Sequence, residues 1–159
     1  MPIKDKESGK KLQSAIEAVV KSDYSWIKNS SNFKFDWSIE SDNEVYKIYL
    51  LDSEDQILGL ISLTDYPEEF RIHMNLIETS ANQRGDIKTI ENIAGCLLAF
   101  GCEVAFNRGY DGFMSLLPKT KLIDLYQDKY GFRQFGRLLA VEGRIARSLI
   151  EKYLLDEES

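Results

Sequence analysis

Residues 70–117 read FRIHMNLIETSANQRGDIKTIENIAGCLLAFGCEVAFNRGYDGFMSLL. Apolar and polar residues alternate over 70–79, which predicts a strand. Apolar residues from Ile90 to Ala105 then recur at helical spacing, and residues 113–117 form a short apolar run typical of a strand. Because a helical crossover joins the two strands, we expect them to lie parallel in one sheet.

The first of these strands carries an irregularity near its end. Ile77 follows Leu76 directly and breaks the alternation, as a β-bulge or a strand end would. We expect a bulge at this pair that turns the strand away from residues 113–117. The resulting gap would leave backbone groups free to pair with the amides of a bound ligand, as in strand addition.

The C-terminal part continues the alternation of helices and strands. Residues 120–130 predict a helix that ends at Gly131, and residues 132–141 predict one extended strand. A last apolar stripe at helical spacing runs from Ile145 to Tyr153. With the preceding strand and helix, this order makes a βαβα unit.

The N-terminal part predicts helices followed by closely spaced strands. Residues 12–20 have apolar positions at helical spacing, and residues 23–31 suggest a second short helix. Alternation over 33–39 predicts a strand, and apolar runs follow over 45–51 and 56–64. Their close spacing favours an antiparallel meander. We therefore predict one α/β domain over residues 1–159, with a mixed sheet.

Composition limits the classes of function. The chain has 20 Lys and Arg against 26 Asp and Glu, a net charge of −6, which argues against general binding of nucleic-acid backbones. No apolar run reaches the 18 residues of a membrane-spanning helix, and the N-terminus lacks the apolar core of a signal peptide. The expectation is a cytoplasmic protein without a membrane partner.

Few side chains suggest metal or nucleophilic chemistry. Cys96 and Cys102 are too few for a zinc site or a disulfide scaffold, and we interpret them as small apolar residues. His73 is the single histidine, and a lone histidine on a strand is more often structural than catalytic. We therefore expect no metal site and no Ser-His-Asp triad.

Three segments together resemble one family. His73-Met74-Asn75-Leu76-Ile77-Glu78-Thr79 resembles the bulged fourth strand of the GNAT superfamily of acetyl-CoA-dependent N-acyltransferases. Asn92-Ile93-Ala94-Gly95-Cys96-Leu97-Leu98 resembles a degenerate form of its pyrophosphate loop, and Tyr126-Gln127-Asp128-Lys129-Tyr130-Gly131-Phe132 resembles its tyrosine helix with Gly-Phe. The resemblance covers roughly residues 45–132. Residues 73–132 are most similar to a bacterial subgroup of unassigned substrate.

The resemblance implies acetyl-CoA as co-substrate and a set of residues that bind it. The loop pattern Gln/Arg-x-x-Gly-x-Gly/Ala, aligned on Ala94, matches only at that small residue. A second alignment places residues 82–87 on the loop pattern and keeps its glycine. In either alignment, Arg84 and Lys88 are candidates to bind the 3′-phosphate of CoA. Backbone amides at a helix start bind phosphates whatever the side chains. The implied cofactor-binding residues are Ile77, Thr79, Asn92, Ile93, Ala94, Gly95, Cys96 and Lys119.

Replacing Gly95 with a bulky residue is expected to block the phosphates of the cofactor and leave the fold intact.

The resemblance also implies catalytic residues. Glu78, or a water beside it, would accept the proton of the attacking amine, and Tyr126 would protonate the leaving thiolate. Five positions separate Tyr126 from Gly131 where the family commonly has four, so Tyr130 competes for the same role.

The implied reaction is direct transfer of an acetyl group to a primary amine, on a small molecule or a protein. The acidic net charge weakly favours a cationic acceptor. A homodimer is one assembly to expect. The alternative, kept open by the degenerate loop, is a CoA-binding or inactive GNAT-like module that acts through protein contacts.

Overall fold

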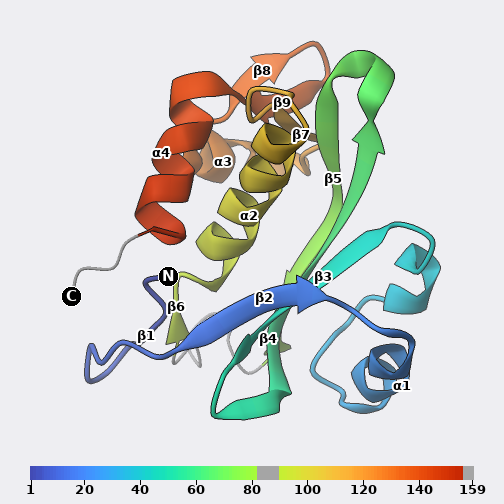
Figure 1. Ribbon diagram of the computed structural model, residues 1–159, viewed down its shortest axis with the longest axis vertical. Helices are drawn as coiled ribbons and strands as arrows, with labels where there is room; N and C mark the ends of the chain where they lie inside the picture. The colour runs from blue at the N-terminus through green and yellow to red at the C-terminus, as the bar shows by residue number, and fades with distance from the viewer. Residues whose placement is uncertain (82–89, 156–159) are drawn as a thin grey trace.

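The computed structural model describes residues 1–81 and 90–155, and a seven-stranded sheet of order β2-β3-β4-β5-β7-β9-β8 forms its centre (Figure 1). A separate two-stranded sheet joins β1 to β6. The strands are β1 (Lys4–Asp5), β2 (Ser14–Ala18), β3 (Glu44–Leu50), β4 (Ser53–Tyr66), β5 (Arg71–Thr79), β6 (Ile90–Glu91), β7 (Met114–Leu116), β8 (Arg133–Phe135) and β9 (Leu138–Val141). The helices are α1 (Lys21–Asn29), α2 (Ile93–Asn107), α3 (Ile123–Tyr130) and α4 (Gly143–Tyr153), with short 3-10 turns η1 (Trp37–Glu40), η2 (Pro67–Glu69) and η5 (Thr120–Leu122).

The sheet is mixed, as the sequence predicts. Neighbouring strands from β2 to β5 are antiparallel, β5 and β7 are parallel, and β9 runs antiparallel to both β7 and β8. The parallel pair confirms the predicted crossover through α2. The resulting α/β architecture confirms the expected fold class.

One face of the sheet carries the main core. Apolar side chains from β3, β4, β5, β7 and β9 meet those of α2, α3 and α4 in one cluster. Helix α2 is apolar on nearly all sides because the sheet covers one side and α4 the other (Figure 1). Two small residues permit the close packing: a Cβ at Gly101 would overlap the sulfur of Met114, and one at Gly59 would lie 3.0 Å from side-chain atoms of Ile93 and Leu97.

The opposite face carries a smaller cluster beneath α1 and η1. Its buried members are Ile27, Trp37, Val45, Ile57 and Leu60. The predicted short helix over 23–31 is confirmed as α1. In Figure 1, α1 lies well apart from α2 and α4.

The predicted helix over residues 12–20 is wrong. This segment contains the strand β2, which pairs with β3 from Ser14 opposite Leu50 to Ala18 opposite Tyr46. The hydrogen-bonded ladder to β3 outweighs the helical spacing, because helix propensity is only a weak local preference.

Two other predicted strands also differ from the structure. Residues 33–39 form an irregular loop that leads into η1, in which Trp37 is buried while Ile39 is 73% exposed. Asp36 accepts a hydrogen bond from the amide of Ser38 and so favours a turn over an extended chain. The single strand expected over 132–141 is a hairpin of β8 and β9, with Gly136 at a φ of 63° between them.

Candidate functional site

Strand β5 extends beyond its short parallel ladder with β7. Only residues Ile72 to Met74 of β5 pair with Met114 to Leu116, while β5 continues to Thr79. Ser62 of β4 lies opposite Leu76 and Leu63 opposite Met74, so the bulge on β5 is at Asn75. The predicted bulge is confirmed, one residue before the expected Leu76–Ile77 pair. All three residues of β7 pair with β5, so the expected splaying of the two strands is not observed, and the gap for a ligand beyond the end of β7 stays a prediction.

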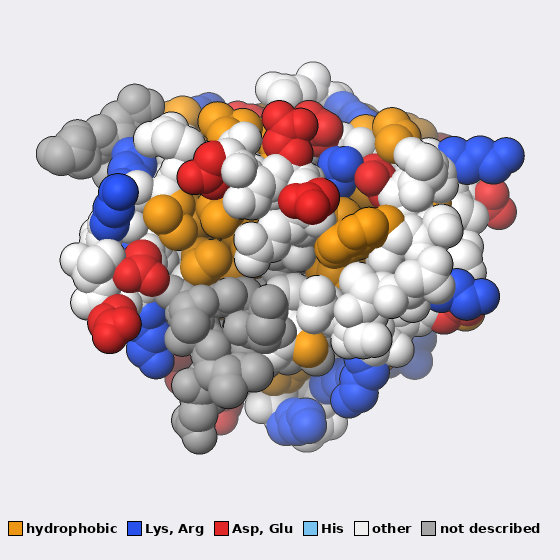
Figure 2. All heavy atoms as spheres, turned by 90° about the horizontal axis from the view of Figure 1, so that it is seen from below, with side chains coloured by type: hydrophobic (Ala, Val, Ile, Leu, Met, Phe, Trp, Pro, Cys, Tyr) orange, Lys and Arg blue, Asp and Glu red, His pale blue; other side chains and the backbone are white. Residues whose placement is uncertain are grey.

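Three of the predicted cofactor residues lie on β5 or follow β7. Ile77 is half-buried on the part of β5 that extends beyond β7, and Thr79 ends the strand. Lys119 follows β7, and its ammonium nitrogen lies 5.5 Å from the ring centre of Phe35. Figure 2 shows the molecule from below, where charged side chains of both signs are interspersed with apolar ones.

Helix α2 begins beside the N-terminal segment of the chain. Asn92 stands before it with a φ of 75° and no side-chain cap, and its amide nitrogen Nδ2 donates to the carbonyl of Pro2 at 2.6 Å. Strand β6, directly before, pairs with β1 so that Glu91 lies opposite Lys4. The amide of Cys96 donates to the carbonyl of Asn92. The amides of residues 93–95 are therefore the ones without an intrahelical partner.

Most side chains of the predicted phosphate loop point into the core. Ile93, Gly95 and Cys96 are buried, and only Asn92 and Ala94 are half-buried. A Cβ at Gly95 would overlap the ring of Tyr153 from α4, at 2.6 Å from Cζ. The expectation that a bulky residue at position 95 leaves the fold intact is therefore wrong. The alternative register over 82–87, with Arg84 and Lys88, lies outside the described residues.

Glu78 is a buried carboxylate that binds a loop. It is 6% exposed, and its oxygens accept hydrogen bonds from the amide of Lys34 at 2.6 Å and from the indole nitrogen of Trp37 at 2.8 Å. The amide of Phe35 donates a longer hydrogen bond of 3.4 Å. These contacts fix residues 34–37 beside the end of β5. The role of Glu78 as a base stays a prediction.

The two candidate tyrosines lie on successive turns of α3. The ring centre of Tyr126 is 5.5 Å from that of Phe132, and burial raises the pKa of its phenol. Tyr130 packs on Tyr153 with ring centres 6.2 Å apart, and burial raises its pKa as well. No described residue forms a hydrogen bond with either hydroxyl. Tyr130 thus faces the packing of α2 on α4, and the choice of acid stays a prediction.

His73 belongs to a polar cluster between β5 and β7. Its Nδ1 lies 2.9 Å from the hydroxyl of Ser115 and 3.1 Å from a guanidinium nitrogen of Arg71. Because a guanidinium only donates, Nδ1 accepts and the ring is neutral. Burial and the charge of Arg71 lower the pKa of His73. The cluster links the two strands where they still pair, in agreement with a structural role.

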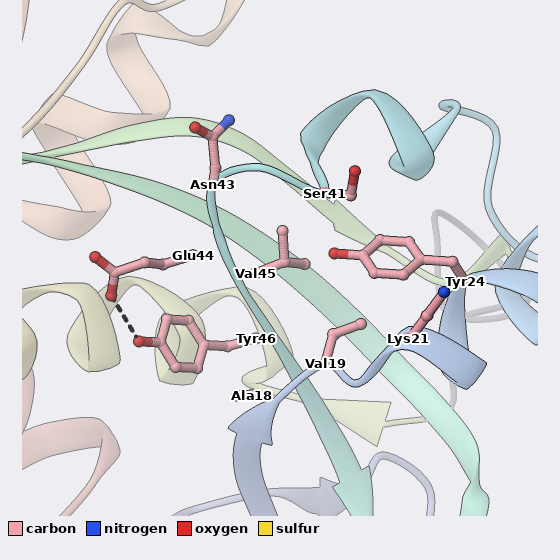
Figure 3. A pocket seen from close by; sticks show the side chains of 9 residues that line it. All are labelled: Ala18, Val19, Lys21, Tyr24, Ser41, Asn43, Glu44, Val45 and Tyr46. Carbon is pink, nitrogen blue, oxygen red and sulfur yellow. Dashed lines mark hydrogen bonds between the residues drawn. The ribbon is translucent and has the colours of Figure 1, made fainter.

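Two hollows lie on the α1 side of the sheet. One of about 390 Å³ lies between the end of β2, α1 and the start of β3, and Figure 3 shows Tyr24 reaching into it from α1 while Glu44 accepts a hydrogen bond from Tyr46. The second, of about 230 Å³, lies between α1 and residues 33–38, and Tyr24 lines it too. The aromatic residues of 33–37 were the available signal for the second hollow, but we interpreted them as a strand.

Other chemistry has little support in the described part of the chain. Both cysteines are free and buried, and burial raises the pKa of each thiol to about 12. Among residues 1–81 and 90–155, no group of three His, Cys, Asp or Glu side chains is placed to hold a metal ion. None of the helices in these ranges combines the length and apolarity that crossing a bilayer requires.

Comparison with known proteins finds likeness in structure alone. No family model and no curated protein matches the sequence. The AtaTR structure bound with AcCoA matches with a TM-score of 0.61 at 12% identity, over 87% of this chain and 98% of that one. Spermidine/spermine N-acetyltransferase SpeG from Vibrio cholerae matches at 0.57 and 14%, over 92% and 98% of the two chains. A GNAT-family acetyltransferase from Staphylococcus aureus matches at 0.56 and 16%, over 78% and 87%. The chain therefore has the fold of GNAT acetyltransferases.

Proposed function

We propose that the protein is an N-acetyltransferase that takes its acetyl group from acetyl-CoA. The observation that carries the proposal is the edge of β5 beyond the bulge at Asn75, which extends past the end of β7 next to the start of α2. The fold supports the same function, since one structure of this fold was determined with AcCoA bound. A cytoplasmic location and a homodimer are further predictions that accompany this proposal.

The backbone around the gap suits the two polar parts of acetyl-CoA. The amides of pantetheine would pair with the edge of β5 over residues 75–77, as an added strand does. The pyrophosphate would lie at the amides of residues 93–95, where the helix end carries about half a positive charge. Because these donors belong to the backbone, the degenerate loop sequence is compatible with binding. Lys119 would contribute a positive charge at the mouth of the gap.

The chemistry requires one proton donor and one proton acceptor. The amine attacks the carbonyl carbon of the thioester, a C–N bond forms and the C–S bond breaks. Tyr126 would give its phenolic proton to the departing thiolate, and its raised pKa keeps that proton in place at neutral pH. Tyr130 is the alternative donor.

Glu78 is better placed to act through a water molecule than directly. Its carboxylate already accepts hydrogen bonds from Lys34 and Trp37. At 6% exposure the carboxylate leaves an amine little room for direct contact, whereas a single water molecule can reach it and pass the proton on. We therefore propose that Glu78 orders the loop of residues 34–37 and receives the proton through a bound water.

Thermal unfolding with and without acetyl-CoA tests the binding part of the proposal. A ligand at 100 times its Kd adds about 2.7 kcal/mol to the free energy of unfolding, a clear rise in Tm. Release of free thiol with a panel of primary amines then tests transfer. Tyr126→Phe should keep the rise in Tm and lose most of the thiol release.

The alternative function gives a different result in the same assays. A CoA-binding module that acts through protein contacts would show the rise in Tm without thiol release for any amine. No rise at millimolar acetyl-CoA would contradict both the enzyme and the CoA-binding module. The acceptor is not defined by the fold, since the names of proteins with this fold include spermidine, nourseothricin and a ribosomal protein.

A further inference from the structure

The bulge on β5 places the side chain of Asn75 on the face of the sheet opposite the main core. Met74 belongs to the main core and Leu76 packs against the smaller cluster. Asn75 is the extra residue between them, and its exposed side chain lies over Ser62 and Thr64 of β4. Because β7 pairs with β5 as far as Met74, a pantetheine chain that follows β5 from the start of α2 would end at Asn75. Asn75 thus stands where the thioester is expected.

A closed ring of hydrogen bonds holds the side chain of Asn75. Its Nδ2 donates to the hydroxyls of Ser62 at 3.2 Å and Thr64 at 2.8 Å. The hydroxyl of Ser62, which is 0% exposed, donates to Oε1 of Glu40 at 2.7 Å. The hydroxyl of Thr64 donates to Oδ1 of Asn43 at 3.3 Å, and Nδ2 of Asn43 donates to Oε1 of Glu40 at 3.2 Å. The ring therefore fixes the Asn75 side chain at the bulge.

The donors in this ring decide which atom of Asn75 faces outward. A carboxylate only accepts, so the single hydroxyl proton of Ser62 is committed to Glu40. The hydroxyl proton of Thr64 is committed to Asn43, whose amide nitrogen donates to Glu40. Both hydroxyls can only accept from Asn75, so the group that faces them is its NH2. Its Oδ1 points away from the ring, and no donor within residues 1–81 and 90–155 forms a hydrogen bond with that oxygen.

We propose that Oδ1 of Asn75 binds the nitrogen of the acceptor amine through one of its N–H groups during acetyl transfer. This inference rests on the proposed function and adds to it a residue that contacts the substrate. The hydrogen bonds that run from Asn75 through Ser62 to the charge of Glu40 polarise the amide and strengthen its oxygen as an acceptor. Asn75 would hold the nitrogen with its lone pair directed at the thioester carbon.

The step needs both N–H groups of a neutral primary amine. The lone pair forms the C–N bond, the C–S bond breaks, and the thiolate takes the phenolic proton of Tyr126. One N–H donates to Asn75, which takes up no proton, and the other gives its proton to the water beside Glu78. A secondary amine has a single N–H and can satisfy only one of these two acceptors. Asn75 would therefore favour primary over secondary amines.

Side-chain amide resonances test the contact without turnover. In labelled protein saturated with CoA, which carries no acetyl group, methylammonium should shift the Nδ2 resonances of Asn75 in a saturable way. Tetramethylammonium has the same charge but no N–H, and should leave them unchanged. The resonances are assigned by their absence from the Asn75→Ala variant. No saturable shift with methylammonium, or an equal shift with tetramethylammonium, would overturn the inference.

The orientation of the amide is tested by aspartate at the same position. The hydroxyls of Ser62 and Thr64 have no proton left for a carboxylate, so Asn75→Asp should lower the Tm at least as much as Asn75→Ala does. If the oxygen of Asn75 faced the hydroxyls instead, aspartate would keep the same contacts. An Asn75→Asp variant with the Tm of the parent protein, beside a lowered Tm for Asn75→Ala, would therefore overturn the assignment.

Kinetics separate a contact with the amine from a merely structural role. Asn75→Ala should lower kcat/KM for methylamine by about tenfold and for dimethylamine by less, measured as thiol release from acetyl-CoA. Asn107→Ala, which removes an exposed asparagine at the end of α2, is the matched control and should change neither value. Equal losses for the two amines in Asn75→Ala would contradict a contact with the amine.

The rise in Tm with acetyl-CoA distinguishes failure of this inference from failure of the function on which it rests. Asn75→Ala should keep the full rise, because the backbone of β5 is unchanged. If acetyl-CoA raises the Tm of the parent protein but methylammonium does not shift Asn75, only the role of Asn75 is wrong. If acetyl-CoA gives no rise, the proposed transfer fails, and a shift of Asn75 by methylammonium alone would then mark an amine site that serves another function.

Discussion

The two faces of the sheet are covered in different ways. On one face, α2, α3 and α4 build a continuous apolar core with the strands. On the other, α1 and η1 cover a smaller cluster, and the loop of residues 34–37 is bound by a single carboxylate, Glu78. The first arrangement suits a rigid support for the cofactor. The second leaves a loop beside the end of β5 that Trp37 anchors in the smaller cluster and Glu78 binds through hydrogen bonds.

Matched truncations of one buried side chain on each face test this difference most strongly. Leu97→Ala should lower the free energy of unfolding by about 4 kcal/mol, and Ile27→Ala by about 2 kcal/mol, because a cavity in the larger core collapses less easily. Leu97 and Ile27 are 0% and 2% exposed. Urea unfolding of both variants measures the two losses. Equal losses, or a larger loss for Ile27→Ala, would contradict the contrast between the faces.

Gly95 tests how tightly the start of α2 is packed. Glycine to alanine within a helix normally stabilises by up to about 1 kcal/mol. Here the added Cβ overlaps Tyr153, so Gly95→Ala should lower the free energy of unfolding by about 1–2 kcal/mol. In the Tyr153→Leu background the same change should cost much less, and a double-mutant cycle measures this coupling. A stabilising Gly95→Ala in the parent protein would show that α2 and α4 are loosely packed.

The cofactor half was predictable because each element there has one dominant signal. Helix α2 is apolar almost throughout, and Gly131 ends α3 with a φ of 79° that glycine adopts readily. The sequence also predicted the strand before that helix, β5, and the strand after it, β7. The broken alternation near Leu76 predicted the bulge on β5 to within one residue.

The other face could not be predicted because its residues depend on distant partners. The apolar positions of residues 12–20 fit a helix as well as an edge strand, and only pairing with β3 decides between them. Residues 33–37 alternate like a strand, but Glu78, more than 40 positions away, binds their amides in a loop. The hollow beside this loop was missed for the same reason.

Glu78→Gln separates positioning from proton transfer. The amide retains one oxygen acceptor but turns an NH2 group toward a buried donor, so we expect the free energy of unfolding to fall by about 1.5–3 kcal/mol. As a positioning residue, Glu78 should affect the KM of the amine more than the affinity for acetyl-CoA. Glu17→Gln, which alters a carboxylate that accepts from Tyr49 at the edge of the sheet, serves as the control. A kcat that loses its dependence on pH while the KM is unchanged would instead make Glu78 the base.

The smallest expected effect is a dependence of stability on pH from His73. Burial and Arg71 lower its pKa in the folded state, so the unfolded chain takes up the proton first as the pH falls below about 6.5. The contribution of His73 to stability is thus complete above that pH and is lost as the pH falls toward the folded-state pKa. His73→Gln should reduce the fall in Tm between pH 7 and pH 5. An unchanged fall in Tm would show that His73 titrates alike in both states.

The most direct test of the central claim is the position at which acetyl-CoA contacts the chain. Amide chemical shifts of the labelled protein, recorded during a titration with acetyl-CoA, report contacts residue by residue. The proposed function predicts saturable changes that are largest for residues 75–77 on β5 and residues 93–95 at the start of α2. Changes confined to the hollow around Tyr24 and Val45, or no saturable change at all, would contradict the assignment of the gap as the acetyl-CoA site.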